Sequence, residues 1–379
     1  MQTILKNIVS TTCALMILAG LATPALGENQ SGDALTIVTI NVWFGLDGHG
    51  MLRMGEYESK EQREKRYLAL VAELREIQPD IVFVQEANPL PHYSRRLARD
   101  TEMDEIHAVN NGGIRVGRIG IPSNLRMGIA ILAKPDLRLE RVGVHRTSGA
   151  GIVSNFLCAH LSETRVVLAG VVRPHSQPLY LFCIHAHSST PDTVEYRNRL
   201  REIMQAQEID PDRYAHHERR FAESSSMTRQ DITYSIPYVQ KIAGDKPFVV
   251  AGDFNAFRPL FPSMTEFAVR LEAIDSFAAA NPGASGYTWD TARNPHTRFD
   301  GSPQWVNGDA KDPIELLQSE YDGSASHRVD YIFLSSHFAR ENIFRSELVF
   351  TKPRDGIYIS DHFGVMTEVS LPAPLESLP

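Results

Sequence analysis

The stretch VVAGDFNAF, residues 249–257, decides which fold this sequence predicts. Its first three residues are apolar and two of them are β-branched, as in a strand that is covered on both faces. The stretch then continues directly into Asp253 and Asn255. Ending a buried strand in a carboxylate and an amide is costly unless those groups are paired or used. The stretch therefore predicts a layered α/β protein with a polar site at a strand end.

Four other segments repeat this design of an apolar run that ends in a polar side chain. They are LTIVTIN ending at Asn41, IVFVQE ending at Glu86, LYLFCIHAH with His185 and His187, and HRVDYIFL around Asp330. Helical patterns lie between them at residues 60–78, 192–207 and 231–244, the last with Pro237 as a kink or helix start. This alternation predicts helices packed outside the sheets.

The chain shows no internal repeat or linker, so we expect a single catalytic domain over residues 28–379. Two stretches, residues 205–230 and 283–327, look like long surface excursions. The second is the better substrate loop, because it carries aromatic residues at Tyr287, Trp289, Phe299 and Trp305. These aromatics would otherwise simply anchor a polar loop.

Residues 1–27 have the pattern of a secretory signal peptide, with Lys6 before an apolar run that ends in small residues. A membrane anchor is the alternative, but Thr11, Thr12 and Pro24 leave the run short. We therefore expect a secreted or periplasmic protein with no transmembrane helix in the mature chain. Its remaining thiols, Cys158 and Cys183, lie in apolar strands and are expected to be buried and inert, with a disulfide as the alternative.

The formal net charge of −8 is weak evidence against a broad grip on a phosphate backbone, which calls for clustered Lys and Arg. A local basic cleft stays open. Sequence motifs of zinc hydrolases and serine hydrolases, such as HExxH and GxSxG, do not occur.

The polar strand-end groups predict a metal site. Side-chain oxygens of the kind that Mg²⁺ or Mn²⁺ prefers come from Asn41, Glu86, Asp253, Asn255 and Asp361. His362 follows Asp361 directly and could act as a general base, with the buried Asp330 as its orienting partner.

Seven motifs give the chain a resemblance to a known family. They are TINVW, VFVQE, MGIAILAK, IHAH, AGDFN, RVDYIF and SDHFG. Their order and approximate spacing over residues 35–371 resemble the metal-dependent endonuclease/exonuclease/phosphatase superfamily, which includes pancreatic deoxyribonuclease, inositol polyphosphate phosphatases and neutral sphingomyelinases. The resemblance implies a four-layer α/β sandwich, in which two packed, mostly antiparallel sheets are flanked by helices.

The resemblance also implies hydrolysis of a phosphodiester by in-line attack of water. It assigns the metal, Mg²⁺ or Mn²⁺, to Asn41, Glu86 and Asp361. The catalytic roles fall to His185 as a donor to phosphate, Asp253 as the group that orients or deprotonates water, Asn255 as a holder of phosphoryl oxygens, and His362 with Asp330. Whether Asp253 or His362 is the base stays open.

Three further residues are candidates for substrate binding: His187, Trp289 and Arg126. The HAH sequence resembles the H-x-H of neutral sphingomyelinases, although His187 is as easily a neighbour on the same strand face.

The sequence leaves two hypotheses for the class of substrate. Export, the acidic chain, HAH and an aromatic loop able to dip into a lipid interface favour a sphingomyelinase-like phospholipid phosphodiesterase with peripheral membrane-surface contact. A secreted endonuclease or exonuclease acting on DNA or RNA is the alternative, favoured by family frequency and by Arg115, Arg118, Arg126 and Arg173. A non-catalytic binding scaffold ranks third, and we expect a monomer.

Overall fold

The computed structural model describes residues 34–372, apart from 48–49, 161 and 298–311. The predicted signal segment lies outside the described residues, and so do Phe299 and Trp305.

One sheet forms the first half of the fold, in the order β15-β16-β1-β2-β6-β3. Its strands are β1 (Ala34–Asn41), β2 (Ile81–Ala87), β3 (Asp104–Asn111), β6 (Met127–Ala133), β15 (Ile343–Val349) and β16 (Gly364–Ser370). β1 and β2 pair in parallel, and the other neighbours pair antiparallel.

A second sheet has the order β13-β14-β12-β11-β10-β7. Its strands are β7 (Glu140–Ser148), β10 (Arg165–Val172), β11 (Leu179–His185), β12 (Phe248–Asp253), β13 (Ile274–Asp275) and β14 (Asp330–Leu334). β11 and β12 are parallel, and the remaining pairs are antiparallel. A smaller sheet, β5-β4-β9-β8, contains β4 (Ile114–Val116), β5 (Ile119–Ile121), β8 (Gly151–Val153) and β9 (Leu157–His160).

The two large sheets pack face to face. Ile37 and Phe83 of the first sheet and Leu181 and Val249 of the second belong to one fully buried cluster. Alternate residues such as Val38 point to the opposite face, where they pack in a separate cluster. Both faces of the central strands, such as β2, β6, β11 and β12, are therefore buried, which explains the unbroken apolar runs in the sequence.

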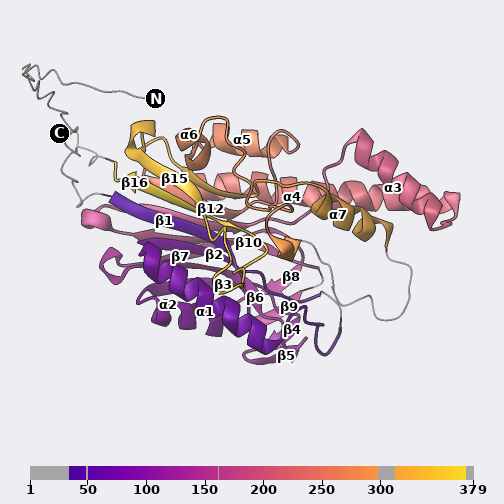
Figure 1. Ribbon diagram of the computed structural model, residues 1–379, viewed down its shortest axis with the longest axis horizontal. Helices are drawn as coiled ribbons and strands as arrows, with labels where there is room; N and C mark the ends of the chain where they lie inside the picture. The colour runs from indigo at the N-terminus through magenta and orange to yellow at the C-terminus, as the bar shows by residue number, and fades with distance from the viewer. Residues whose placement is uncertain (1–33, 48–49, 161, 298–311, 373–379) are drawn as a thin grey trace, which may run out of the picture. The chain divides into compact units, whose positions relative to one another are not determined.

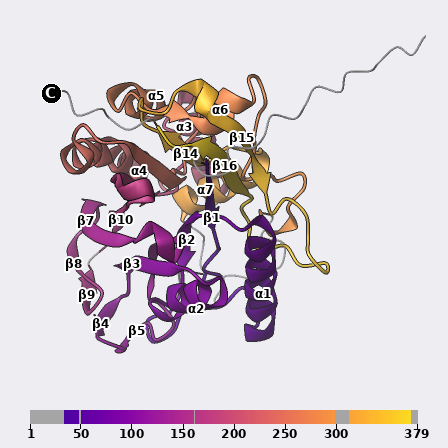
Figure 2. The same ribbon diagram turned by 90° about the vertical axis from the view of Figure 1, so that its left-hand side faces the viewer.

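Helices cover the two outer faces (Figures 1 and 2). α1 (Lys60–Ile77) and α2 (His92–Asp100) pack on the first sheet through Leu70, Leu74 and Leu97. α4 (Tyr214–Ala243) and α5 (Pro262–Arg270) pack on the second sheet through Ile236 and Phe267. Short α6 (Ser276–Ala280) lies beside β14 and β15. The predicted four-layer sandwich is confirmed.

Residues 205–230 correct one expectation, because they are largely helical rather than a surface loop. α3 (Val194–Ala206) is followed after a short turn by α4, which runs through Pro237 instead of beginning there. Buried Phe221 packs with residues of α3 and of α7 (Pro313–Ser324), so this charged and Ser-rich stretch has an apolar side that a helix can bury. Part of the second predicted excursion is likewise helix α7.

Cys158 and Cys183 are free and buried, as expected for inert thiols. Burial raises the pKa of Cys183 to about 12. None of the described helices combines the length and the hydropathy that a bilayer crossing requires.

Candidate active site

Strand register gathers the predicted residues at one edge of the sandwich. In the first sheet Asn41 ends β1 and Glu86 lies near the end of the adjacent β2. In the second sheet His185 of β11 pairs with Asp253 of β12, which in turn pairs with Asp330 of β14. The sheets meet at this edge, because Asn41 Nδ2 donates to Asp253 Oδ2 at 3.0 Å and to Glu86 Oε1 at 3.1 Å.

Unusual backbone conformations aim several of these side chains. Gly252 has φ +145°, and a Cβ there would lie 2.0 Å from the carbonyl oxygen of Ile184, so only glycine fits before Asp253. Glu86 has φ +59° within an irregular register between Val84 and Ala87, and Asn255 has φ +47°. Left-handed conformations of non-glycine residues are strained and gather at functional sites.

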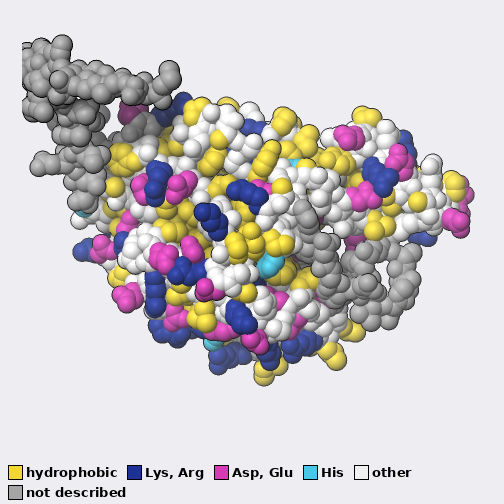
Figure 3. Space-filling view, in the orientation of Figure 1, with side chains coloured by type: hydrophobic (Ala, Val, Ile, Leu, Met, Phe, Trp, Pro, Cys, Tyr) yellow, Lys and Arg dark blue, Asp and Glu magenta, His cyan; other side chains and the backbone are white. Residues whose placement is uncertain are grey.

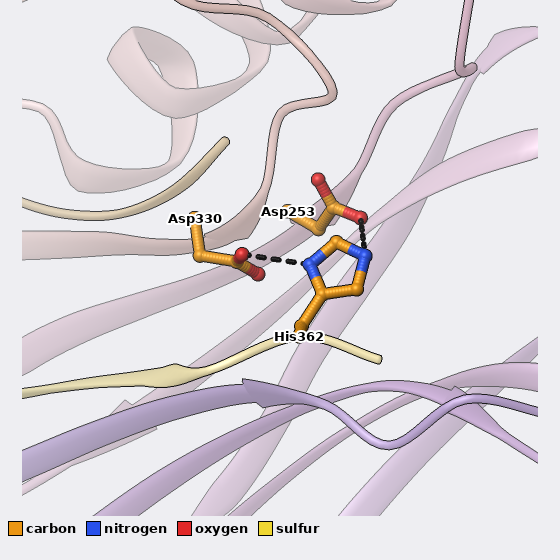
Figure 4. A group of neighbouring side chains, drawn as sticks. All are labelled: Asp253, Asp330 and His362. Atoms are coloured by element: carbon orange, nitrogen blue, oxygen red, sulfur yellow. Dashed lines mark hydrogen bonds and ion pairs between the residues drawn. The ribbon is translucent and has the colours of Figure 1, made fainter. Parts of the chain in front are cut away.

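His362 and Asp330 form the predicted dyad (Figure 4). His362 Nδ1 lies 2.8 Å from Asp330 Oδ2, and its Nε2 lies 3.9 Å from Asp253 Oδ2. Asp330 is fully buried, and its backbone N–H donates to Thr288 Oγ1 at 3.1 Å. The carboxylate thus fixes the ring, and the second ring nitrogen faces Asp253.

Electrostatics in this group favour a charged imidazole beside a carboxyl of raised pKa. Burial opposes protonation of His362, but the negative charges of Asp330 and Asp253 raise its pKa well above the usual value. Burial, together with the charge of Asp330, raises the pKa of Asp253 to about 7. A carboxyl whose pKa is raised to about 7, beside a histidine of raised pKa, suits acid/base catalysis.

Glu86, which is partly exposed, and the buried Asp361 form an acidic pair whose charges interact. Burial raises the pKa of both, and the charge of Asp361 raises that of Glu86 further. Such repulsion is relieved by a cation between the two carboxylates, and their hard oxygens suit a divalent ion. The donor set therefore fits the predicted metal. Asn41, the third predicted ligand, here presents Nδ2 to the carboxylates, and its Oδ1 accepts from the Trp43 N–H at 3.0 Å.

Among the described residues, a different trio has ligand atoms within 4.8 Å of one another: Asp253, Asp330 and His362. We assign this trio to acid/base chemistry rather than to the metal. The reason is that Asp330 Oδ2 and His362 Nδ1 lie 2.8 Å apart, the arrangement of an imidazole held by an orienting carboxylate.

His185 lies between the acids of both sheets. Its Nε2 is 3.7 Å from Glu86 Oε1 and 3.6 Å from Asp253 Oδ2. Burial lowers the pKa of His185 well below its usual value, and the charges of Arg165, His362 and His187 lower it further. A neutral ring at this position can donate one hydrogen bond to a phosphoryl oxygen.

His187 is held by a second aspartate, which the sequence did not single out. Asp231 Oδ2 accepts from the backbone N–H of His187 at 2.9 Å and lies 2.8 Å from its Nδ1. Ser148 Oγ lies 3.2 Å from the same ring nitrogen, and the buried Nε2 has no hydrogen-bond partner. The nearest carboxylate to this nitrogen is that of Glu163, whose Oε2 lies 3.8 Å away. The predicted substrate role of His187 stays a prediction.

Of the remaining predicted residues, Asn255 and Trp289 contact the catalytic cluster, whereas Arg126 lies in a separate cavity. Asn255 Nδ2 donates to the Ala186 carbonyl at 3.0 Å and to Asp253 Oδ2 at 3.3 Å, so it belongs to the cluster. The Trp289 ring meets the ring of His362 edge-on, with 5.2 Å between the centroids. Arg126 is instead part of an arginine-lined cavity beside α2.

Two supporting residues were missed by sequence reasoning. Asn294 is buried and donates from Nδ2 to the carbonyls of Ser360 and Asp361, at 2.9 and 3.0 Å. Arg66 of α1 donates to the Ile359 carbonyl at 2.6 Å and helps to hold the same loop. For Asn294, the sequence offered one signal, because an asparagine followed by a proline is typical of a turn. For Arg66, the sequence offered none, since an arginine is ordinary in a helix.

Comparison with known proteins identifies the family of the chain. Residues 38–362 match the model of the Endonuclease/Exonuclease/phosphatase family, so the chain belongs to that family. It is accordingly a metal-dependent phosphoric ester hydrolase. A search of curated proteins gave no match.

Solved structures share the fold at low sequence identity. A functionally unknown conserved protein from Enterococcus faecalis V583 has a TM-score of 0.53 and 16% identity, over 89% of this chain and 100% of that one. A D. rerio TDP2 humanized by 14 mutations has a TM-score of 0.51 and 17% identity, over 89% and 99%. The human Nocturnin catalytic domain with bound sulfate has a TM-score of 0.51 and 14% identity, over 89% and 94%.

Proposed function

We propose that this protein is a secreted Mg²⁺-dependent phosphodiesterase that hydrolyses the headgroup phosphodiester of a phospholipid, as a sphingomyelinase does. The observation that carries the reaction is the dyad of His362 and Asp330, set 3.9 Å from Asp253 beside the acidic pair of Glu86 and Asp361.

The chain's own groups supply the proton transfers. A water oxygen forms a bond to phosphorus as the bond to the leaving oxygen breaks on the opposite side. The proton of that water passes to Asp253 or, when its ring is neutral, to His362. The leaving oxygen takes up a proton from the other of these two groups or from solvent water. His185 donates a hydrogen bond to a phosphoryl oxygen, whose charge increases in the transition state. Asn255 does the same by exchanging one of its present bonds, to the Ala186 carbonyl or to Asp253, for the substrate.

Glu86 and Asp361, with Asn41, would hold the metal. A Mg²⁺ ion supplies positive charge that neutralises the phosphoryl group, and Mn²⁺ offers the same oxygen chemistry.

Support for a lipid substrate comes from several features. The chain is acidic, with a net charge of −8, and it carries the HAH sequence, whose second histidine has a buried Nε2 without a hydrogen bond, 3.8 Å from Glu163 Oε2. A nuclease is the second candidate, because six arginines line one cavity beside α2. The predicted aromatic loop gives limited support, since Tyr287 is exposed but Trp289 packs on His362.

An assay with matched substrates tests this proposal. The mature protein is incubated with Mg²⁺ and either sphingomyelin in mixed micelles, supercoiled plasmid or single-stranded RNA, and each reaction is repeated with excess chelator. We expect chelator-sensitive release of choline phosphate. Nicking or shortening of nucleic acid without choline phosphate release would establish the nuclease instead, and no hydrolysis of any substrate would favour a binding scaffold.

Export is part of the same proposal, since residues 1–27 predict a signal peptide. Expression of the full chain in a bacterial host, followed by N-terminal sequencing of the processed protein, is expected to give a start near Glu28.

A further inference from the structure

The smaller sheet carries an apolar face on its exposed side. In β4 the side chains of Ile114 and Val116 are exposed, whereas Arg115 between them is buried. Strand register aligns these residues with neighbours on the same face. One row runs through Ile121, Ile114, Ala159 and Ile152, and the other through Ile119, Val116 and Leu157.

This face reverses the usual pattern of an antiparallel sheet, in which the apolar side is buried. Exposed fractions reach 85% for Ile119, 65% for Ile114 and 67% for Phe156 in the adjoining turn. Directly opposed residues of an antiparallel pair touch each other, so these side chains form a continuous patch. Continuous exposed apolar patches mark binding surfaces.

A basic cavity adjoins this sheet. It has a volume of about 360 Å³ and is lined by Arg95, Arg96, Arg99, Arg115, Arg118 and Arg126. No acidic side chain is among its lining residues. Three of these arginines are already paired with carboxylates: Arg95 with Glu105, Arg96 with Glu64, and Arg99 with Asp100. Arg115 and Arg126 donate to backbone carbonyls. Arg118 lies exposed in the turn between β4 and β5 and, among the described residues, has no carboxylate partner. A cavity of this composition fits an anion with several oxygens, such as a phosphate.

The smaller sheet lies at the same edge of the sandwich as the active site. Its strands lie in two connections, residues 112–126 between β3 and β6 and residues 149–164 between β7 and β10. β6 begins beside the end of β2, where Gly128 pairs with Ala87 next to Glu86. Figure 1 shows β4, β5, β8 and β9 together at one end of the sheets, and Figure 3 shows hydrophobic side chains beside Lys and Arg along that edge.

We propose that this apolar sheet and the arginine cavity dock the protein onto a membrane that contains anionic phospholipids. The cavity takes a headgroup phosphate, and the aliphatic rows enter the boundary between headgroups and acyl chains. This inference rests on the proposed function, and it adds the surface that turns the active-site edge toward the lipid.

Other occupants fit the surface less well. Phe156 is the one aromatic side chain among these patch residues, whereas Ile, Val and Leu offer no faces on which nucleic-acid bases stack. In a symmetric dimer a second copy would bring the same arginines to the interface, and these like charges would repel. A membrane with anionic lipids satisfies both the apolar rows and the positive cavity.

Vesicle sedimentation tests the proposal. The protein is mixed, in excess chelator to prevent turnover, with vesicles of phosphatidylcholine alone or of phosphatidylcholine and phosphatidylglycerol in equal parts. We expect binding to the mixed vesicles. The double variant Ile119→Ser/Phe156→Ser and the variant Arg118→Glu should each weaken binding about tenfold, because each removes apolar or charge contact at exposed positions.

Matched controls change equally exposed residues elsewhere. Val269→Ser/Phe344→Ser and Arg229→Glu should bind the mixed vesicles as the wild type does. All variants should hydrolyse the soluble diester bis(p-nitrophenyl) phosphate with Mg²⁺ at the wild-type rate.

The outcomes separate the two proposals. Wild-type protein that does not bind mixed vesicles, or patch variants that bind as well as their controls, would overturn the docking surface even if the soluble diester is hydrolysed. Vesicle binding without hydrolysis of any diester would refute the proposed function alone. A wild-type dimer that Ile119→Ser/Phe156→Ser dissociates, or oligonucleotide binding without vesicle binding, would also contradict docking.

Discussion

At the scale of single residues, the structure makes the pair of His362 and Asp330 the most direct target. His362→Ala removes the ring that faces Asp253, and we expect kcat for bis(p-nitrophenyl) phosphate to fall about a thousandfold. Asp330→Asn keeps the shape but loses the negative charge that orients and charges the ring, so a smaller loss is expected.

The matched control is His216→Ala, which changes an exposed histidine on α4. It should leave kcat unchanged, and all three variants should show the circular dichroism of the wild type. A His362→Ala variant that is folded and turns over at the wild-type rate would remove the dyad from the mechanism.

Residues at strand ends were predictable, because an apolar run that stops at Asp253 or Glu86 is visible in the sequence. Asp231 was not, since it lies within a helix and its partner His187 is far away along the chain. Nothing in a helical pattern marks one aspartate as the group that a distant strand needs. The sequence also could not predict that the side-chain oxygen of Asn41 accepts from the backbone N–H of Trp43.

At the scale of elements, Gly252 is what lets β12 approach β11 closely before Asp253. Gly252→Ala combines a positive φ with a Cβ 2.0 Å from the Ile184 carbonyl oxygen, so we expect the free energy of unfolding to fall by about 3 kcal/mol or more. Chemical denaturation measures this loss. Gly283→Ala has a positive φ but no atom within 4 Å of the added Cβ, and it should cost only about 1 kcal/mol. Equal losses in both variants would mean that the close approach has no role.

The clamp between α4 and the end of β11 predicts a pH dependence of stability. Burial raises the pKa of Asp231, but its bond to His187 and the charge of His187, with a bond from Thr147, outweigh burial and lower it. Ionised Asp231 therefore stabilises the folded state at pH values above about 3.9, the pKa of an aspartate in the unfolded chain. This stabilisation is lost as the pH falls below that value toward the lower pKa that Asp231 has in the folded protein. Urea denaturation from pH 7 to pH 3 should show this loss, with a flatter curve for Asp231→Asn. Parallel curves would contradict the clamp.

Element types were largely predictable, because strands buried on both faces leave unbroken apolar runs and α1 leaves a periodic stripe. The stretch at residues 205–230 was not, since charge and serine dominate its composition. Its apolar contacts, such as Phe221 with Leu200 and Leu317, depend on elements distant in sequence.

At the scale of the whole molecule, one edge of the sandwich collects acids from both sheets with the His362 loop. The family and fold followed from the order of the motifs, whereas the apolar face of the smaller sheet did not. The strands of the smaller sheet are short and have an ordinary β-branched composition. Their apolar side chains are exposed because Arg115 and Cys158 on the opposite face are the residues that pack inward.

Mg²⁺ binding measured together with hydrolysis tests most directly whether these acids share one metal-dependent phosphodiesterase site. Titration calorimetry and bis(p-nitrophenyl) phosphate turnover are compared for the wild type, Glu86→Gln, Asp361→Asn and the exposed control Glu315→Gln. We expect Glu86→Gln and Asp361→Asn each to weaken Mg²⁺ binding at least about tenfold and to lower turnover in parallel, while Glu315→Gln matches the wild type. Wild-type turnover that persists in excess chelator, or Mg²⁺ binding that survives both substitutions, would contradict the shared site.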